Sequence, residues 1–143
     1  MIRKYKANDL TQVIDIWYKS STIAHPFLEN DFVEKVKKDM QEIYIPKAET
    51  WVYEENEIII GFISMFGNEI AGLFVDINQQ TKGIGTQLVD FTAKLHNELE
   101  VEVFEKNKIG RSFYDKYGFN FIKKYFDKIS NQEILRLKFI KHE

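Results

Sequence analysis

The residues with the clearest capacity for chemistry form a glycine turn near the middle of the chain, Gln80–Gly85. The turn follows an apolar run, Leu73–Val75, and opens an amphipathic segment that reaches about His96. This order predicts a strand, a turn and a helix, which aim unpaired backbone N–H groups and the positive end of a helix at one point. Gly83 and Gly85 let a ligand come close to the backbone because they carry no Cβ. The turn is therefore a candidate phosphate site.

A second set of polar residues lies further along the chain, where Asn107 and Tyr114 stand seven residues apart. Seven residues make almost two turns of an α-helix, so the two side chains share one face and their Cα atoms lie roughly 10 Å apart. Gly110 falls between them on the same face and leaves a shallow gap. A helix face with a polar group at each end and a gap between them suits a thin, extended ligand.

Hydrophobic spacing predicts the elements that must position these residues. The sequence predicts a strand at 2–5, helices at about 10–21 and 30–42, strands at 50–53, 58–66 and 70–75, a helix at 84–96, a strand at 99–104, a helix at 107–117, and strands at 120–126 and 134–140. The order β-α-α-β-β-β-α-β-α-β-β favours an α/β (α+β) fold with a mixed, mostly antiparallel sheet and helices on both faces. Residues 73–104 should form a right-handed parallel crossover.

Length and composition bound the class of protein. The 143 residues, 44% of them apolar and 15% aromatic, suffice for one domain over residues 1–143 with its own core. The net charge of −2, with Lys and Arg spread along the chain, disfavours a nucleic-acid partner. Neither a membrane-spanning stretch nor an apolar signal region is found in the sequence, so we expect a cytoplasmic protein without a membrane partner.

Several reaction classes are excluded by what the sequence lacks. The chain has no cysteine, which excludes a thiolate zinc site and a cysteine acyl-enzyme. The G-x-S-x-G motif and metal-ligand spacings are absent, so we expect neither a serine-hydrolase elbow nor a metal. Leu88 stands where a dinucleotide fingerprint needs its third glycine. Any acyl transfer must then run directly from donor to acceptor or use another nucleophile.

Together the two motifs resemble those of the GNAT superfamily of acetyl-CoA-dependent N-acetyltransferases. The chain carries Q-x-x-G-x-G after the strand that ends at Val75, and N-x-x-G-x-x-x-Y-x-x-x-G-F about 20 residues later. Each motif alone is loose, but the pair in these elements is specific, and the resemblance covers essentially the whole domain. The stretch from Ile16 to Leu28 is similar to a bacterial subgroup with proposed protein-lysine acetyltransferase activity.

The resemblance implies a site for acetyl-CoA. In the family the glycine turn holds the CoA pyrophosphate, and the preceding strand pairs with the pantetheine arm as another strand would. Asn107 would hydrogen-bond that arm, and Tyr114 would stand beside the CoA sulfur. The cofactor-binding residues implied in this way are Leu73, Phe74, Val75, Gln80, Thr81, Lys82, Gly83, Ile84, Gly85, Thr86, Asn107, Gly110 and Tyr114.

Acetyl transfer to an amine also requires proton transfers. An ammonium group of the lysine type has a pKa near 10.4, so a base must take a proton before the neutral amine attacks. Tyr114 can donate a proton to the leaving thiolate, and a backbone N–H near Val75 can stabilise the oxyanion. Glu105 is the first candidate for the base, because it follows the strand at 99–104 at its carboxyl end. Catalytic roles are thus predicted for Tyr114, Asn107 and Glu105.

His25 is the second candidate for the base, since histidine titrates near neutrality and this one lies in an apolar loop. With Phe27 it is also predicted to contact the acceptor. Each candidate has a structural explanation as well. His25 precedes a proline and fits a structural loop residue. Glu105 fits a solvated charge, Asn107 a helix cap and Tyr114 a core aromatic residue.

We therefore predict an N-acetyltransferase that moves an acetyl group directly from acetyl-CoA to a primary amine, with Tyr114 as general acid. The acceptor is a protein lysine, a protein N-terminus or a small amine, and the sequence leaves this choice open. The alternative is a non-catalytic module that binds and senses CoA or acetyl-CoA, against which the intact Asn107 and Tyr114 argue. The protein is expected to be a monomer or a homodimer.

Overall fold

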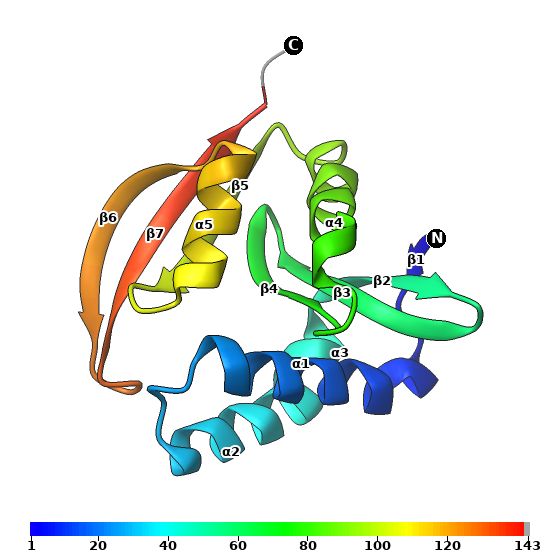
Figure 1. Ribbon diagram of the computed structural model, residues 1–143, viewed down its shortest axis with the longest axis horizontal. Helices are drawn as coiled ribbons and strands as arrows, with labels where there is room; N and C mark the ends of the chain where they lie inside the picture. Colours follow the sequence, from blue (N-terminus) through cyan, green and yellow to red (C-terminus); the bar gives the residue numbers. More distant parts are fainter. Residues whose placement is uncertain (142–143) are drawn as a thin grey trace.

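The computed structural model describes residues 1–141, apart from the side chain of Thr81 (Figure 1). Seven strands form one sheet in the order β1-β2-β3-β4-β5-β7-β6. The strands are β1 (Ile2–Lys4), β2 (Glu49–Glu55), β3 (Ile58–Phe66), β4 (Glu69–Val75), β5 (Glu98–Phe104), β6 (Asn120–Asp127) and β7 (Gln132–Ile140). The helices are α1 (Leu10–Ala24), α2 (Asn30–Asp39), α3 (Ile45–Lys47), α4 (Ile84–Ala93) and α5 (Lys108–Tyr117), together with the segments η1 (Ala7–Asp9), η2 (Met40–Tyr44) and η3 (Gln80–Lys82).

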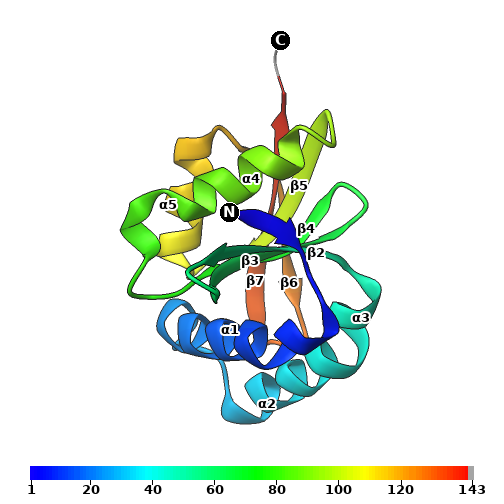
Figure 2. The same cartoon turned by 90° about the vertical axis from the view of Figure 1, so that its right-hand side faces the viewer.

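The sheet is antiparallel except between β4 and β5, which run parallel. Figure 2 shows α1 and α2 on one face of the sheet and α4 and α5 on the other. The structure therefore confirms the predicted order of elements, the mixed and mostly antiparallel sheet, and the helices on both faces. Among residues 1–141, no helix combines the length and apolar character that crossing a membrane requires.

The pairing of β4 with β5 is short. The two strands have seven residues each but pair only at Glu69↔Glu100 and Ile70↔Val101. The register of β4 against β3 shifts between Ser64 and Met65, next to this point. Such an irregularity bends a strand and increases its twist. Beyond Ile70 the edge of β4 that faces β5 is consequently left without a partner strand.

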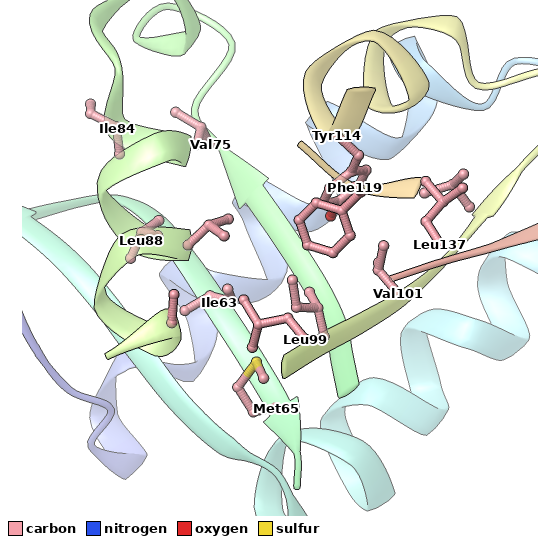
Figure 3. Close-up of a cluster of buried hydrophobic side chains, with 14 of the residues drawn as sticks. Ile63, Met65, Val75, Ile84, Leu88, Leu99, Val101, Tyr114, Phe119 and Leu137 are labelled. Atoms are coloured by element: carbon pink, nitrogen blue, oxygen red, sulfur yellow. The ribbon is translucent and has the colours of Figure 1, made fainter. Parts of the chain in front are cut away.

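Two apolar clusters hold the helices on the sheet. On the face covered by α4 and α5, Leu88 of α4 packs with Ile63, Leu99 and neighbouring strand residues (Figure 3). On the other face, Val13 and Trp17 of α1 pack against the sheet. Burying a side chain of this size contributes about 1.5–3 kcal/mol relative to leaving it exposed. These clusters fix both helix layers that flank the gap between β4 and β5.

The end of α1 differs from the prediction. The helix continues to Ala24 instead of ending near Ser20 and Ser21. Both serines are buried side chains within the helix and do not end it. The backbone N–H of His25 donates to the Ser21 carbonyl at 2.7 Å and closes the helix. Pro26 disfavours a helical conformation of the residue before it, so the helix ends at this point. The longer α1 carries His25 to the cavity described below.

Two other helix boundaries were also wrong. The segment predicted as one helix at 30–42 is α2 followed by the π-helical turn η2 and by α3. Helix α4 ends at Ala93, three residues before His96. The N–H groups of Leu95 and His96 both donate to the Thr92 carbonyl, which turns the chain toward β5.

Candidate functional site

A cavity of about 640 Å³ opens where β4 and β5 part. Its wall is formed by α1, α2, β4, β5, the turn before α4, and α5. Many of the residues that the sequence predicts for a site line this one cavity: His25, Leu73, Phe74, Val75, Gln80, Gly83, Gly85, Thr86, Asn107, Gly110 and Tyr114. The cavity thus brings together the turn and the polar helix face that the two sequence motifs predict.

The turn before α4 presents backbone donors to the cavity. Gly83 has a φ of 77°, the left-handed conformation that favours glycine, and is the N-cap of the helix. The first helical bond runs from the N–H of Gln87 to the Gly83 carbonyl at 3.1 Å. The N–H groups of Ile84, Gly85 and Thr86 precede that bond and have no partner within the helix. Together with the helix dipole they suit an anionic group.

Other residues of the turn have separate roles. The side chain of Ile84 is in the core, so only its backbone can serve a ligand. Lys82 is exposed and does not line the cavity. The side chain of Thr81 lies outside the described residues. A Cβ on Gly85 would lie 3.3 Å from Phe113 of α5, so glycine keeps the start of α4 close to α5.

The open edge of β4 offers further backbone groups. The N–H of Asp76 donates to the Ile60 carbonyl at 2.8 Å, which makes these two residues a hydrogen-bonded pair of the β3–β4 ladder. Because such pairs alternate along an antiparallel ladder, Leu73 and Val75 direct their N–H and C=O groups away from β3. The Val75 carbonyl accepts from the Ser20 hydroxyl at 2.9 Å and from the Gln80 amide at 3.1 Å. These bonds tie α1 and the turn to the end of β4.

Asn107 is the N-cap of α5. Its Oδ1 accepts from the Gly110 N–H at 2.9 Å, and its Nδ2 lies 3.1 Å from His25 Nε2. A Cβ on Gly110 would lie 2.6 Å from that Nδ2, so glycine at this position leaves room for the Asn107 side-chain amide. The structural explanation of Asn107 as a cap is therefore correct, and the same side chain also lines the cavity.

His25 connects α1 to Asn107. Its Nδ1 lies 3.0 Å from Ser21 Oγ, and its ring packs edge-on against Phe27 and Phe104, with centroid distances of 5.8 and 5.1 Å. Burial lowers the pKa of His25 to about 4. The imidazole is therefore neutral at pH 7. Phe27 itself does not line the cavity and instead packs edge-on against the ring of His25.

Tyr114 is buried in the core and lines the cavity as well. Figure 3 shows it beside Phe119, and its ring packs edge-on against Phe113 and Phe119 with centroid distances of 5.2 and 5.0 Å. Burial raises the pKa of the Tyr114 hydroxyl well above its ordinary value of 10. The hydroxyl is consequently a neutral proton donor at physiological pH.

Glu105 lies outside the cavity. Its carboxylate pairs with Lys124 of β6 at 3.2 Å, and its carbonyl accepts from Arg111 at 2.9 Å. The carboxylates that do line the cavity are Glu69 and Glu102, which the sequence analysis did not select. A signal for Glu102 is present in the sequence, because acidic residues at alternate positions of β5 share one face of the sheet.

One arginine links these carboxylates. Arg136 of β7 contacts Glu69 at 3.1 Å, Glu100 at 2.7 Å and Glu102 at 3.2 Å. The hydrogen bonds that Arg136 donates, first of all the one to Glu100, raise the pKa of Arg136 above its ordinary value. Three carboxylates around one guanidinium leave a net negative charge next to the cavity. That charge favours a cationic ligand.

Comparison with known proteins gives consistent results. A family model described as an acetyltransferase (GNAT) domain matches residues 46–121. The chain is 31% identical over 123 residues to peptidyl-lysine N-acetyltransferase YiaC of Escherichia coli (strain K12), a match that covers 85% of this chain and 84% of that protein. It is 29% identical over 119 residues to peptidyl-lysine N-acetyltransferase YjaB of the same strain, with 82% and 80% covered.

Solved structures agree with this result. The solution structure of apo YjaB from Escherichia coli has a TM-score of 0.87 at 26% identity and covers 96% of this chain and 95% of that chain. The PaiA N-acetyltransferase of Thermoplasma acidophilum, solved in complex with coenzyme A, has a TM-score of 0.79 at 21% identity, with 97% and 98% covered. These likenesses confirm the fold that the two sequence motifs predict.

Proposed function

Because the chain belongs to the GNAT acetyltransferase family and is therefore an acyltransferase, we propose that it transfers the acetyl group of acetyl-CoA to the side-chain amine of a protein lysine. The relatives named as peptidyl-lysine N-acetyltransferases support this acceptor. The net negative charge beside the cavity supports it too, since lysine reaches the site as a cation. A cytoplasmic location, a monomer or homodimer, and one domain over residues 1–143 stay predictions.

One observation carries the proposal: a single cavity joins the N-terminus of α4, the open edge of β4, and the pair Asn107 and Tyr114. Acetyl-CoA supplies a thioester that makes the acetyl carbon open to attack by an amine. The N–H groups at the start of α4 suit its pyrophosphate. The N–H and C=O of Leu73 and the N–H of Val75 suit an extended, amide-containing arm, as they would suit another strand. Asn107 adds a side-chain amide to the wall of the same cavity.

Tyr114 acts as the general acid in this proposal. As the amine nitrogen bonds to the acetyl carbon, the carbon–sulfur bond breaks and its electron pair remains on sulfur. The neutral Tyr114 hydroxyl gives its proton to that sulfur. The proton that the amine loses restores the tyrosine, through the base or through water, so that the protein is unchanged after the reaction.

The base is assigned to a carboxylate in the cavity wall. Glu102 is the preferred candidate, because Tyr125 at 2.9 Å and Arg136 at 3.2 Å hold its carboxylate in place beside the cavity. The earlier candidate, Glu105, has no support from the geometry, since its carboxylate pairs with Lys124 outside the cavity. His25 has no free ring nitrogen for this task, as argued below.

The first test is isothermal titration with acetyl-CoA, with NADH as a matched nucleotide control. We expect saturable one-to-one binding of acetyl-CoA and none of NADH. An N-terminally blocked peptide with one lysine should then gain one acetyl group, located by mass spectrometry. The same peptide with norleucine in place of lysine should gain none. Failure of acetyl-CoA to bind, or acetylation of the norleucine peptide, would contradict the proposal.

A further inference from the structure

The hydrogen bonds around Asn107 fix which nitrogen of His25 carries the proton. Asn107 Oδ1 accepts from the Gly110 N–H, so the other end of the amide, Nδ2, carries the hydrogens. Nδ2 faces His25 Nε2 at 3.1 Å, and this contact is a hydrogen bond only if Nε2 accepts. A neutral imidazole that accepts at Nε2 has its proton on Nδ1, which faces Ser21 Oγ at 3.0 Å.

The ring of His25 is itself fixed in place. Its backbone N–H closes α1 on the Ser21 carbonyl, Pro26 restrains the next peptide, and Phe27 and Phe104 contact the ring on its sides. Both ring nitrogens are occupied, one by Ser21 and one by Asn107. No lone pair is left on the ring to take a proton from an acceptor amine. The arrangement instead aims one lone pair, that of Nε2, at the amide of Asn107.

The amide of Asn107 is thus held at both ends. The helix cap fixes Oδ1, and His25 fixes Nδ2. One of the two Nδ2 hydrogens is used by His25, and the second remains on a side chain that lines the cavity. An amide with a fixed plane presents that second hydrogen in one direction, whereas an amide held only by its oxygen can swing about that bond.

We propose that His25 is a positioning residue for the acetyl-CoA site, in which Nε2 orients the Asn107 amide so that its second Nδ2 hydrogen meets a carbonyl oxygen of the bound arm. This inference rests on the function proposed above. His25 then acts on the cofactor through Asn107, and neither contacts the acceptor nor transfers a proton.

Two amide variants separate this role from ring packing. Gln at position 25 places Oε1 where Nε2 stood and keeps an acceptor for Asn107. Asn reaches only as far as Nδ1 and can serve Ser21 but not Asn107. Both variants lose the ring and its aromatic contacts equally. We expect His25→Asn to weaken acetyl-CoA binding about tenfold, as for the loss of one hydrogen bond, and His25→Gln to bind like the wild type.

A double-mutant cycle shows whether His25 acts through Asn107. In an Asn107→Ala background, His25→Asn should have no further effect on the dissociation constant measured by titration. Equal affinity of His25→Asn and His25→Gln, or a full effect of His25→Asn without Asn107, would overturn the proposal. His96→Asn is the matched control, because His96 does not line the cavity.

A spectroscopic readout tests the same contact without any ligand. Nitrogen NMR of the imidazoles at pH 7 should show His25 protonated on Nδ1 and unprotonated on Nε2, with the His25 signals assigned as those missing from the His25→Gln spectrum. A proton on Nε2 would overturn the proposal. If the wild type fails to bind acetyl-CoA, the proposed function is wrong, and the tautomer still reports whether His25 orients Asn107. If the wild type binds and acetylates lysine while both variants bind alike, only the role of His25 is wrong.

Discussion

The ring of Tyr114 packs in the core, and the same side chain also lines the cavity. Contacts with Phe113 and Phe119 fix the ring, so packing sets the place of the hydroxyl. Burial keeps the hydroxyl neutral. A hydroxyl that keeps its proton at physiological pH has that proton to give to the sulfur as the carbon–sulfur bond breaks.

We expect Tyr114→Phe to lower kcat about 100-fold or more, the effect of losing a general acid. The affinity for acetyl-CoA should stay within about threefold of the wild type, because the ring and its packing are kept. Steady-state release of free thiol measures the first quantity and titration the second.

The control for this variant is Tyr117→Phe. Tyr117 lies three residues further along α5, and its hydroxyl donates to Asp90 at 2.7 Å, away from the cavity. Loss of that hydroxyl should leave kcat unchanged. An unaltered kcat in Tyr114→Phe would show that the proton reaches sulfur from another source.

Single residues were predicted from sequence only where local spacing fixes their neighbours. The seven-residue interval places Asn107 and Tyr114 on one helix face in any α-helix, and the structure puts both at the cavity. Ser20 was missed because its importance comes from the Val75 carbonyl, 55 residues away in the chain. Glu105 was selected, and Glu102 was missed, because the sequence does not show that the chain turns away after β5, where the Asn107 N–H donates to the Phe104 carbonyl.

At the scale of elements, the start of α5 combines a helix cap with a ligand-facing amide. Gly110 is the residue that allows both, since a Cβ there would collide with Asn107 Nδ2. Stability and binding should therefore respond differently to a substitution at this position. The cap is worth about 1 kcal/mol, and replacing a helical glycine by alanine gains about the same amount.

We expect Gly110→Ala to leave the free energy of unfolding nearly unchanged while weakening acetyl-CoA binding about tenfold, because the amide of Asn107 is displaced. Urea unfolding and titration measure the two quantities. Ser112→Ala is the control, since Ser112 is exposed on the same helix and does not line the cavity. If Gly110→Ala binds as tightly as the wild type, the observed position of Asn107 is not needed for binding.

Most strands and helices were predictable because their hydrophobic periods are strong and their turns carry glycine or asparagine. Strand β3 has the predicted bounds, and the other strands begin or end within two residues of them. The parting of β4 from β5 was not predictable from local sequence. It depends on a register shift opposite Ser64 and Met65 and on where a strand more than twenty residues away enters the sheet. The cavity lies where the two strands part, so the residues that line it could be identified only from the structure.

At the scale of the whole molecule, His25 couples folding to pH. Its pKa is about 4 in the folded chain and near 6.5 when the residue is exposed. Between these values the unfolded chain binds a proton that the folded chain does not bind, so the free energy of unfolding falls as the pH falls from 6.5 to 4. Each pKa unit by which folding lowers the pKa corresponds to roughly 1.4 kcal/mol.

We expect urea unfolding of the wild type to show this loss across pH 6.5 to 4, and His25→Gln to show a clearly smaller loss over the same interval. Acidification also removes the part of the free energy of unfolding that comes from Asp9, whose pKa is lowered by Arg3, but it does so equally in both proteins. The difference between the two curves therefore isolates His25. Parallel curves would mean that the imidazole titrates normally in the folded chain.

The short contact between β4 and β5 divides the sheet into two blocks. One block contains β1, β2, β3 and β4, the other contains β5, β7 and β6, and the two blocks pair at two residue positions along the seam between them. Arg136 bridges that seam, because it forms ion pairs with Glu69 of the first block and with Glu100 and Glu102 of the second. A ligand that lies along the free edge of β4 and touches α5 bridges the same two blocks from the other end. Bound acetyl-CoA is therefore expected to stiffen the molecule across this seam, in addition to the apolar cluster that already packs residues of both blocks together.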